Sequence, residues 1–475
     1  MKTKIISKTL AFLVLIVFIT SCKLEQKTKQ ESKAVPQTFL NSNDTTTMAS
    51  LNWRQYFSDP NLVALIDTAL KNNQELNILL QEIQISKNEI RARKGEYLPF
   101  VGLRAGAGVE KAGQYTRNGS VEENLEIKSG KAFPDPLSDF MVGAVASWEV
   151  DVWKKLRNAK KSATMRYLAT VEGKNFMVTN LIAEIANSYY ELMALDNQLS
   201  IIQQNTAIQT DALEIVKQQK DAAKLSQLAV NRFEAQLLNT KNLQYQIQQN
   251  IVETENRINF LTARFPTAIP RSSAGFNDMV LDSAYVGIPS QLLVNRPDIR
   301  QAELELAAAR LDVKSARANF YPSFSITAGA GFQSFNTAYL VSPKSIMYNL
   351  MGDLIAPVVN RNAIQAAYNS ANAKQIQQVC DYERAILNAY VDVVNQLSKV
   401  QNFSKSYETK SQEVNILMQS IVISNNLFRS ARADYLEVLL TQREALESKM
   451  DLIEIRMKQL DAKVNIYKTL GGGWR

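Results

Sequence analysis

Residues 320–335 read FYPSFSITAGAGFQSF, and this stretch decides the fold. From Phe324 to Phe332 the even positions are apolar, while the odd positions between them are serine, threonine and glycine. A period of two is that of a β-strand with one apolar face. Residues 140–152, FMVGAVASWEVDV, alternate in the same way, and residues 97–109 and 346–356 do so less strictly. Such segments of about ten residues are typical of transmembrane barrel strands, although a soluble sheet shares their period.

The first strand segment is a copy of the third. Residues 97–108, YLPFVGLRAGAG, align without gaps on residues 320–331, FYPSFSITAGAG. Later in each half, Arg157-Asn158-Ala159 matches Arg361-Asn362-Ala363. The spacing indicates a longer loop in the first half, which falls between Gly113 and Asp139. We therefore predict a tandem repeat, residues 51–288 and 289–475, each with a helix, two strands and a helical hairpin.

Two long segments lack glycine and proline and predict helices. Residues 174–265 form one such run and residues 358–470 the other, both with apolar side chains three and four apart. A single helix of the second segment would be about 170 Å long. We therefore expect each segment to be a coiled-coil hairpin with two arms near 80 Å. A compact helical bundle is the alternative, but its helices usually turn every 10–20 residues.

The N-terminus predicts export and lipidation. Lysines at positions 2, 4 and 8 precede the apolar run Leu10–Ile19, which is too short to span a membrane and suits a signal peptide. Because Cys22 follows directly after Thr20 and Ser21, residues 1–21 are predicted to be a lipoprotein signal and Cys22 the lipidated residue. The alternative is an ordinary signal peptide. Residues 22–50 are polar and predict a linker, flexible unless it packs on a neighbouring part.

The composition excludes most catalytic chemistry. The 475 residues include no histidine and only two cysteines, Cys22 and Cys380. Histidine-based catalysis and thiolate zinc sites are therefore excluded, and we expect no enzyme activity, no cofactor and no metal. Cys380 is predicted to be a packing residue. The formal net charge of +8 comes without a dense basic run, so nucleic-acid binding is not expected.

The strand count predicts an oligomer. Four strands cannot close a barrel, because the smallest membrane barrels have eight. An open edge in lipid would leave backbone groups unpaired. Other copies of the chain must therefore supply the missing strands, and three copies would give twelve.

Three strings carry a resemblance to a known family: Arg296-Pro297-Asp298-Ile-Arg-Gln-Ala-Glu303, Asp151-Val152-Trp153 and Leu470-Gly-Gly-Gly-Trp474. Over residues 51–475 the chain resembles the TolC-like outer-membrane efflux proteins, in particular the NodT-type lipoproteins paired with RND pumps. The resemblance implies a mainly α fold with a small β part, trimeric, with a 12-stranded β-barrel and a periplasmic α-barrel. It implies a passive, gated conduit for drugs or other small molecules in the outer membrane of a Gram-negative bacterium. The implied partners are a periplasmic adaptor, an inner-membrane RND transporter and outer-membrane lipid.

The resemblance also places candidate sites at the hairpin turns. A periplasmic gate would involve Arg429, Arg432, Asp434, Tyr435 and Leu436, unless these are solvated tip residues. Adaptor-contacting tips would include Ala223, Leu225, Ser226, Leu228 and Ala431, unless these belong to an ordinary coiled-coil seam. Where the family has glycine at each tip, this chain has Ala223 and Ala431. Trp148 and Trp153 are membrane-interface anchors or core residues.

Two other functions remain open at the level of sequence. One is a channel for type I protein secretion, against which the lipoprotein signal and the string at residues 296–298 argue. The other is a structural coiled-coil lipoprotein that forms no channel.

Overall fold

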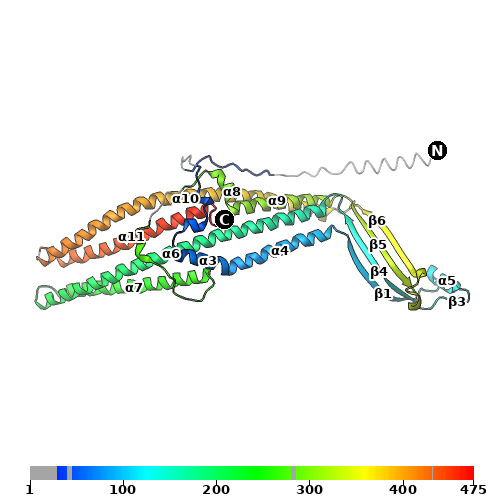
Figure 1. Cartoon of the computed structure of the whole chain (residues 1–475), viewed down its shortest axis with the longest axis horizontal. Helices are drawn as coiled ribbons and strands as arrows, with labels where there is room; N and C mark the ends of the chain where they lie inside the picture. Colours follow the sequence, from blue (N-terminus) through cyan, green and yellow to red (C-terminus); the bar gives the residue numbers. More distant parts are fainter. Residues whose placement is uncertain (1–28, 40–44, 280–284, 431) are drawn as a thin grey trace.

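The computed structural model describes residues 29–39, 45–279, 285–430 and 432–475. The molecule is elongated, with a β-sheet at one end and two helical hairpins at the other (Figure 1). The same order of long elements occurs twice, which confirms a mainly helical fold with a small β part. The boundaries of the two repeats remain a prediction. The first set is α3 (Pro60–Asn72), α4 (Gln74–Glu96), β1 (Phe100–Glu110), β4 (Leu137–Val150), α6 (Lys155–Asp221) and α7 (Gln227–Leu261). The second set is α8 (Leu292–Asn295), α9 (Pro297–Ala318), β5 (Ser323–Ser334), β6 (Ile346–Ile355), α10 (Asn362–Arg429) and α11 (Tyr435–Thr469).

The four predicted strands form one antiparallel sheet in the order β1-β4-β5-β6. The two copies of the repeated segment, β1 and β5, both pair with β4, which lies between them. At the centre, Gly143 of β4 lies opposite Gly331 of β5. A Cβ added at Gly331 would lie 2.3 Å from the carbonyl oxygen of Val142, so this register requires a residue without a side chain. The strands β1 and β6 each have one neighbour within the chain and form its two edges.

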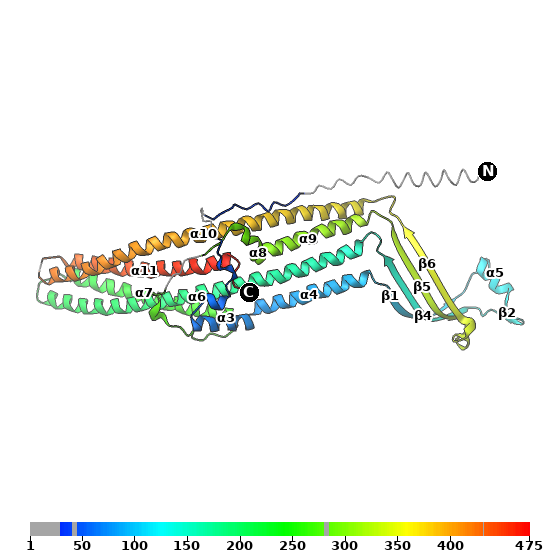
Figure 2. The same cartoon turned by 45° about the horizontal axis from the view of Figure 1, so that its top comes forward.

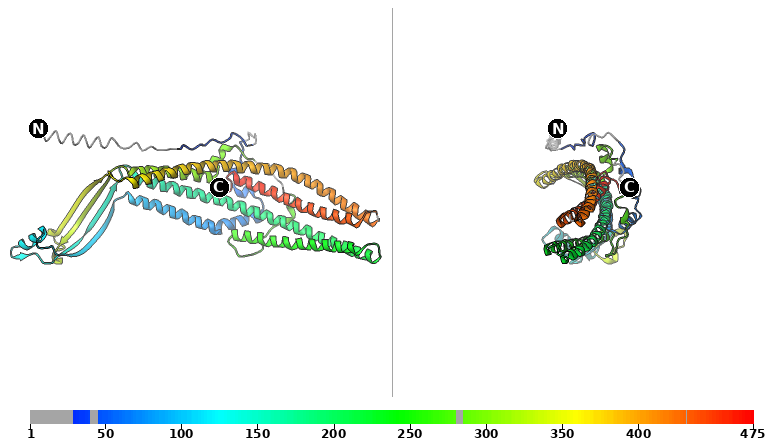
Figure 3. Two further views of the ribbon diagram at one scale, coloured as in Figure 1. Left: turned by 180° about the vertical axis from the view of Figure 1, so that it is seen from behind. Right: turned by 90° about the vertical axis from the view of Figure 1, so that its left-hand side faces the viewer.

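Each strand continues into a helix, and the helices keep the order of the strands. The chain passes from α4 into β1, from β4 into α6, from α9 into β5 and from β6 into α10. The helices α4, α6, α9 and α10 therefore lie side by side and continue the sheet along the long axis of the molecule, to the left of the strands in Figure 2. Seen along its length, this layer is curved and concave on one side (Figure 3). The curvature is that of a wall segment of a tube.

Both hairpins exist, but the prediction of equal arms near 80 Å is wrong. The helices α6 and α10 have 67 and 68 residues, whereas α7 and α11 have 35 each. At 1.5 Å per residue, the arms are about 100 Å and 52 Å long. The helix α6 is longer than expected because it runs through Gly173. A Cβ at Gly173 would lie 3.2 Å from the Gln301 side chain of α9, so glycine permits close helix packing there.

The hydrophobic core lies near the middle of the elongated molecule, where α3 packs on α6. The helix α3 begins at Pro60, and the Asp59 carboxylate accepts hydrogen bonds from the amides of Asn61 and Leu62. Leu62 and Ile66 are fully buried beside the middle of α6. Burying each such side chain stabilises the fold by about 1.5–3 kcal/mol. The Tyr189 hydroxyl of α6 donates to Asp59 over 2.8 Å and joins the helix cap to the long helix.

Residues 29–39, here called the N-terminal arm, pack on α9 and α10 rather than extending freely. The Lys29 ammonium lies 2.7 Å from Glu383, and Lys33 lies 2.6 Å from Glu303. Phe39 is fully buried and stacks on Tyr390 at 5.4 Å. Further along, the short helix η1 (Met48–Ser50) is also ordered. The predicted linker is therefore laid on the helices over much of its length (Figure 1).

The extra length of the loop after β1 forms a small substructure at the far end of the sheet. It consists of α5 (Arg117–Asn124) and the hairpin of β2 (Glu126–Lys128) and β3 (Lys131–Ala132). It lies within the predicted interval between Gly113 and Asp139.

Candidate functional site

The two edge strands expose apolar side chains. On β1, Leu103 is 91% exposed, and on β6, Tyr348 and Leu350 are 83% and 77% exposed. Their backbone groups on the outer edges have no partner strand within the described part of the chain. An exposed apolar edge of this kind pairs with another strand. The sheet thus has the properties of one segment of a larger barrel.

The strand-to-helix junctions carry both predicted tryptophans. The Trp148 indole donates to the carbonyl oxygen of Tyr97 at 3.0 Å, and Trp153 donates to that of Pro322 at 2.8 Å. Trp153 also stacks on Tyr321 at 4.7 Å. Both tryptophan side chains are more than a third exposed, so they form a partly exposed aromatic layer at one end of the sheet. Amphipathic aromatic rings of this kind are enriched at membrane interfaces.

A polar hollow of about 870 Å³ lies on one face of the helix layer below the sheet. Its lining combines small side chains with charged ones from α4, α6, α9 and α10: Glu89, Arg93, Arg166, Glu305, Asp312 and Lys374. Arg166 forms an ion pair with Asp312 across α6 and α9. Burial raises the pKa of Glu305. A polar, charged lining is that of a water-filled space rather than of a packed core.

The first hairpin turn keeps a glycine-like geometry although it contains alanine. Ala223 has a φ of 54°, in the left-handed region. The amide of Lys224 donates to the carbonyl of Gln219, and that of Ala223 to Lys220, as in the Schellman motif that ends many helices. Ala223, Ser226 and Leu228 are exposed at this turn, whereas Leu225 packs on the apolar cluster behind it. Three of the four described adaptor candidates of this turn are thus open to a partner.

The second turn repeats this pattern. The amide of Arg432 donates to the carbonyl of Leu427, the same six-residue closure as in the first turn. Arg429, Arg432 and Asp434 are exposed, and Leu436 is half-buried. Tyr435 differs, because its ring packs against the first hairpin, on the cluster formed by Leu213, Val216, Ala229, Val230, Phe233 and Leu237. The two hairpin turns are therefore held side by side within one chain.

Two predicted site residues lie outside the described part of the chain. They are the lipidation candidate Cys22 and the tip residue Ala431. The other cysteine, Cys380, was predicted to be a packing residue, and this is wrong. Its side chain is exposed on α10, with its sulfur 3.7 Å from the Lys29 ammonium. Lys29 of the N-terminal arm also pairs with Glu383 on this part of α10.

Arg296 joins two of the three strings that carry the resemblance, residues 296–303 and the glycine-rich end at residues 470–474. Its guanidinium, of which 8% is exposed, pairs with Asp298 at 2.7 Å and donates to the carbonyl of Thr469 at 3.1 Å. A Cβ at Gly471 would lie 2.5 Å from the carbonyl oxygen of Asn295, so the glycines after α11 allow the chain end to approach α8. The helix α9 begins at Pro297 and has Asp298 in its first turn. No pattern in the sequence shows that Arg296 connects the start of α9 to the end of α11.

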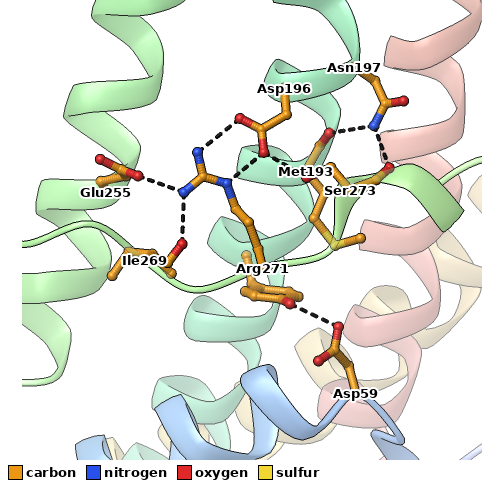
Figure 4. A network of polar contacts seen from close by, with 9 residues as sticks. Asp59, Met193, Asp196, Asn197, Glu255, Ile269, Arg271 and Ser273 are labelled. Atoms are coloured by element: carbon orange, nitrogen blue, oxygen red, sulfur yellow. Dashed lines mark hydrogen bonds and ion pairs between the residues drawn. The ribbon is translucent and has the colours of Figure 1, made fainter. Parts of the chain in front are cut away.

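A second arginine with carboxylate partners, Arg271, is partly buried and was not found from the sequence. Arg271 follows α7 and donates to Asp196 of α6 at 2.6 and 2.9 Å and to Glu255 of α7 at 2.6 Å (Figure 4). Hydrogen bonds to Asp196 and Glu255 raise its pKa. Ser273 donates to the same Asp196 carboxylate at 2.6 Å. This network fixes the segment after α7 on the long helix. No local pattern marks Arg271, because its partners are 75 and 16 residues away.

Asp461 lies in a groove between α6 and α11 and has a strongly shifted pKa. Burial, with repulsion from Glu191, raises its pKa from 3.8 to about 7, while Lys399 opposes the shift. The groove also contains Glu184, Arg257 and Lys468. A carboxyl with this pKa changes its charge near neutral pH.

We expect Asp461→Asn to make the stability less dependent on pH. Because the folded pKa lies above the unfolded value, the folded state binds the proton more tightly. Stability is therefore lost as the pH rises from about 4 through 7. Above pH 8 the variant should be more stable than the wild type by on the order of 4 kcal/mol, and at pH 4 by nearly nothing. Thermal melting at both pH values measures this, and an equal shift at the two values would contradict it.

The described residues contain neither a metal-binding cluster nor a membrane-spanning helix. Within them, no three cysteine, histidine or acidic side chains are grouped so that they could hold a metal ion. None of the helices in the described ranges is long and apolar enough to cross a bilayer.

Comparison with known proteins identifies relatives along the whole chain. The model of the family described as outer membrane efflux protein matches residues 65–264 and 288–472. The toluene efflux pump outer membrane protein TtgI of Pseudomonas putida is 27% identical over 422 residues, 89% of this chain and 87% of the relative. The cation efflux system protein CusC of Escherichia coli is 26% identical over 473 residues, 98% and 99% of the two chains. The open state of the MtrE outer membrane channel of Neisseria gonorrhoeae superposes with a TM-score of 0.82 at 22% identity. The match covers 96% of this chain and 99% of that one.

Proposed function

This chain belongs to the outer membrane efflux protein family, and from that premise we propose that it is the outer-membrane channel of a tripartite efflux pump of the RND type. It acts as a passive conduit, and members of this family are channel proteins rather than enzymes. The relatives named for toluene and for cations differ in cargo, while the fold is the same. The substrate is therefore chosen elsewhere in the pump.

The observation that carries the proposal is the open four-stranded sheet on a curved helix layer. Its edges β1 and β6 are apolar, and neither has an outer partner strand within the described ranges. If β6 of one copy pairs with β1 of the next, three copies give a closed barrel of twelve strands. The same three-fold symmetry continues the α4, α6, α9 and α10 layer into a tube, with the polar hollow facing its interior.

The exposed hairpin turns are the proposed contact with the rest of the pump. In a tube of this kind, the turns lie at the end farthest from the sheet. The exposed Ala223, Ser226 and Leu228 would contact a periplasmic adaptor protein, and Leu225 and Ala431 belong to the same proposed surface. The exposed Arg429, Arg432 and Asp434 would narrow the opening, together with Tyr435 and Leu436.

Recording single channels in planar bilayers tests the function. The purified protein should give discrete conductance steps, and a deletion strain expressing it with its pump should recover efflux of the pump's substrates. A structural coiled-coil lipoprotein would give no conductance. A type I secretion channel would conduct but would not restore export of small molecules.

The lipid anchor at Cys22 gives a separate prediction. Cells supplied with a clickable fatty acid should label the wild type, and Cys22→Ser should lose the label entirely, because only the cysteine thiol can be acylated at the processed N-terminus. Cys380→Ser is the matched control and should keep the label. Equal labelling of the Cys22→Ser protein would rule out this anchor.

A further inference from the structure

A basic pocket lies on α9 beside the N-terminal arm. It encloses about 330 Å³, and its polar lining includes Lys29 of the arm, Arg310, Lys314 and Arg317 of α9, and Gln375 of α10. We call these five residues the basic pocket. Four of them are cationic. Since the three residues of α9 follow at intervals of four and three, they share one face of that helix.

Two of the four cations are available to a ligand. Lys29 is paired with Glu383 and Arg310 with Glu31. The side chains of Lys314 and Arg317 are exposed, and neither side chain forms a hydrogen bond or ion pair with another residue in the described ranges. The pocket therefore presents two uncompensated positive charges next to two compensated ones. An anionic ligand would match these two uncompensated positive charges.

Gln375 places a second, independent requirement on a ligand of the basic pocket, namely a hydrogen-bond donor. Its side chain is 3% exposed, and its Oε1 atom has no hydrogen-bond donor within the described part of the chain. A buried carbonyl oxygen without a donor is costly. An occupant that carries a hydroxyl or ammonium group beside its anionic group would supply that donor.

The pocket faces away from the interior of the proposed tube. On α9, the polar hollow is lined by Glu305 and Asp312. At 100° per residue, these two positions lie on the side of the helix opposite to Arg310 and Lys314. The N-terminal arm also runs on the convex side of the helix layer (Figure 3). The basic pocket is thus on the outer surface.

Its height matches the headgroup layer of a membrane, given the proposed function, on which this inference rests. Tyr321 and its stacking partner Trp153 mark the end of the sheet. Arg317 precedes Tyr321 by four residues, or about 6 Å of helix, and the polar layer on each side of a bilayer is about 5–8 Å thick. Cys22 precedes Lys29 by seven residues, a span of at most about 25 Å. A lipidated Cys22 would therefore reach the same leaflet.

We propose that the basic pocket binds the headgroup of a glycerophospholipid from the periplasmic leaflet of the outer membrane. The phosphodiester oxygens accept hydrogen bonds from the Lys314 ammonium and the Arg317 guanidinium. The headgroup hydroxyl or ammonium donates to Oε1 of Gln375. The site adds a headgroup contact on the same face as the lipid anchor.

Native mass spectrometry of the detergent-solubilised protein, titrated with short-chain phosphatidylglycerol, tests the charge requirement. We expect Lys314→Ala/Arg317→Ala to weaken binding at least tenfold. The matched control is Lys224→Ala/Lys374→Ala, which removes the same charge at a hairpin turn and on the opposite face. It should bind like the wild type. Equal binding by the Lys314→Ala/Arg317→Ala protein and the wild type would overturn the proposal.

Gln375→Leu tests the second requirement. The wild type should prefer phosphatidylglycerol over phosphatidylmethanol, which lacks the donor, and Gln375→Leu should lose that preference. If inorganic phosphate displaces the lipid at equal concentration, the pocket binds an adventitious ion only and the proposal fails. Conductance is recorded on the same samples. Conducting wild-type protein without headgroup binding refutes this inference alone, whereas absent conductance refutes the proposed function.

Discussion

Arg296→Ala is expected to destabilise the protein by about 3–5 kcal/mol, the loss that follows when a buried ion pair is broken. The guanidinium is buried near the middle of the molecule, and its removal leaves the Asp298 carboxylate and the Thr469 carbonyl without their donor. For a chain of this length we expect a melting temperature lower by on the order of 5 °C, with less folded protein. Circular dichroism of the solubilised protein during heating measures this loss.

The matched control is Arg93→Ala. Arg93 contacts two carboxylates, Glu89 and Glu96, but its side chain is 42% exposed on the surface of α4. Exposed pairs contribute only about 0–1 kcal/mol, so this variant should melt close to the wild type. Arg296→Lys should be intermediate, because it keeps the charge and loses the forked geometry. Equal melting temperatures of the Arg296→Ala and Arg93→Ala variants would show that the stability of the core does not depend on the contacts of Arg296.

The second large effect is expected at the proposed gate. If Asp434 lines the opening, a three-fold assembly would bring three Asp434 carboxylates close to one another. Like charges about 6 Å apart repel by about 1–3 kcal/mol at effective dielectric constants of 20–60. Within one chain, Arg429 and Arg432 are exposed and form no ion pair with another described residue, so they are free to compensate a neighbour's Asp434. The channel of the Arg429→Ala/Arg432→Ala variant should therefore leak. We expect it to have a higher conductance, and cells that express it to be more sensitive to vancomycin.

Arg443→Ala/Lys449→Ala is the control for this experiment, because it removes the same charge from α11 away from the turn. It should leave conductance and vancomycin resistance unchanged. Asp434→Ala should weaken any preference of the channel for cations. A normally expressed, trimeric double arginine variant with wild-type conductance would place the closure elsewhere. A steric closure by Leu427, Phe428 and Leu436 would then be the better account.

The gate and adaptor residues stay predictions, since a single chain contains none of the contacts that would define them. The structure nevertheless shows how two of these candidate residues are placed within one chain. Tyr435 was grouped with the gate, but in one chain its ring packs between the two hairpins. The alanine at the first turn left the tip geometry open in the sequence, and the structure shows that Ala223 adopts the left-handed conformation.

The local elements follow from the amino-acid sequence alone, because their causes lie within a few residues. A period of two in hydrophobicity predicted the four strands, and the absence of glycine and proline predicted the helical hairpins. The duplication was visible because both copies keep the same string. The start of α6 was not predicted, because the helix continues through Gly173, where it packs closely on Gln301 of α9.

The tertiary structure decided which charges are buried and where the polar segments lie. Arg296 meets the carbonyl of Thr469, 173 residues away, and Arg271 meets Asp196, 75 residues away. The N-terminal arm reaches Glu383 across 354 residues. Such contacts depend on side chains brought together by the fold, and no local period records them. The sequence around a loop arginine does not show whether the arginine will be buried. Its burial and its carboxylate partners are set only when packing removes water from around it.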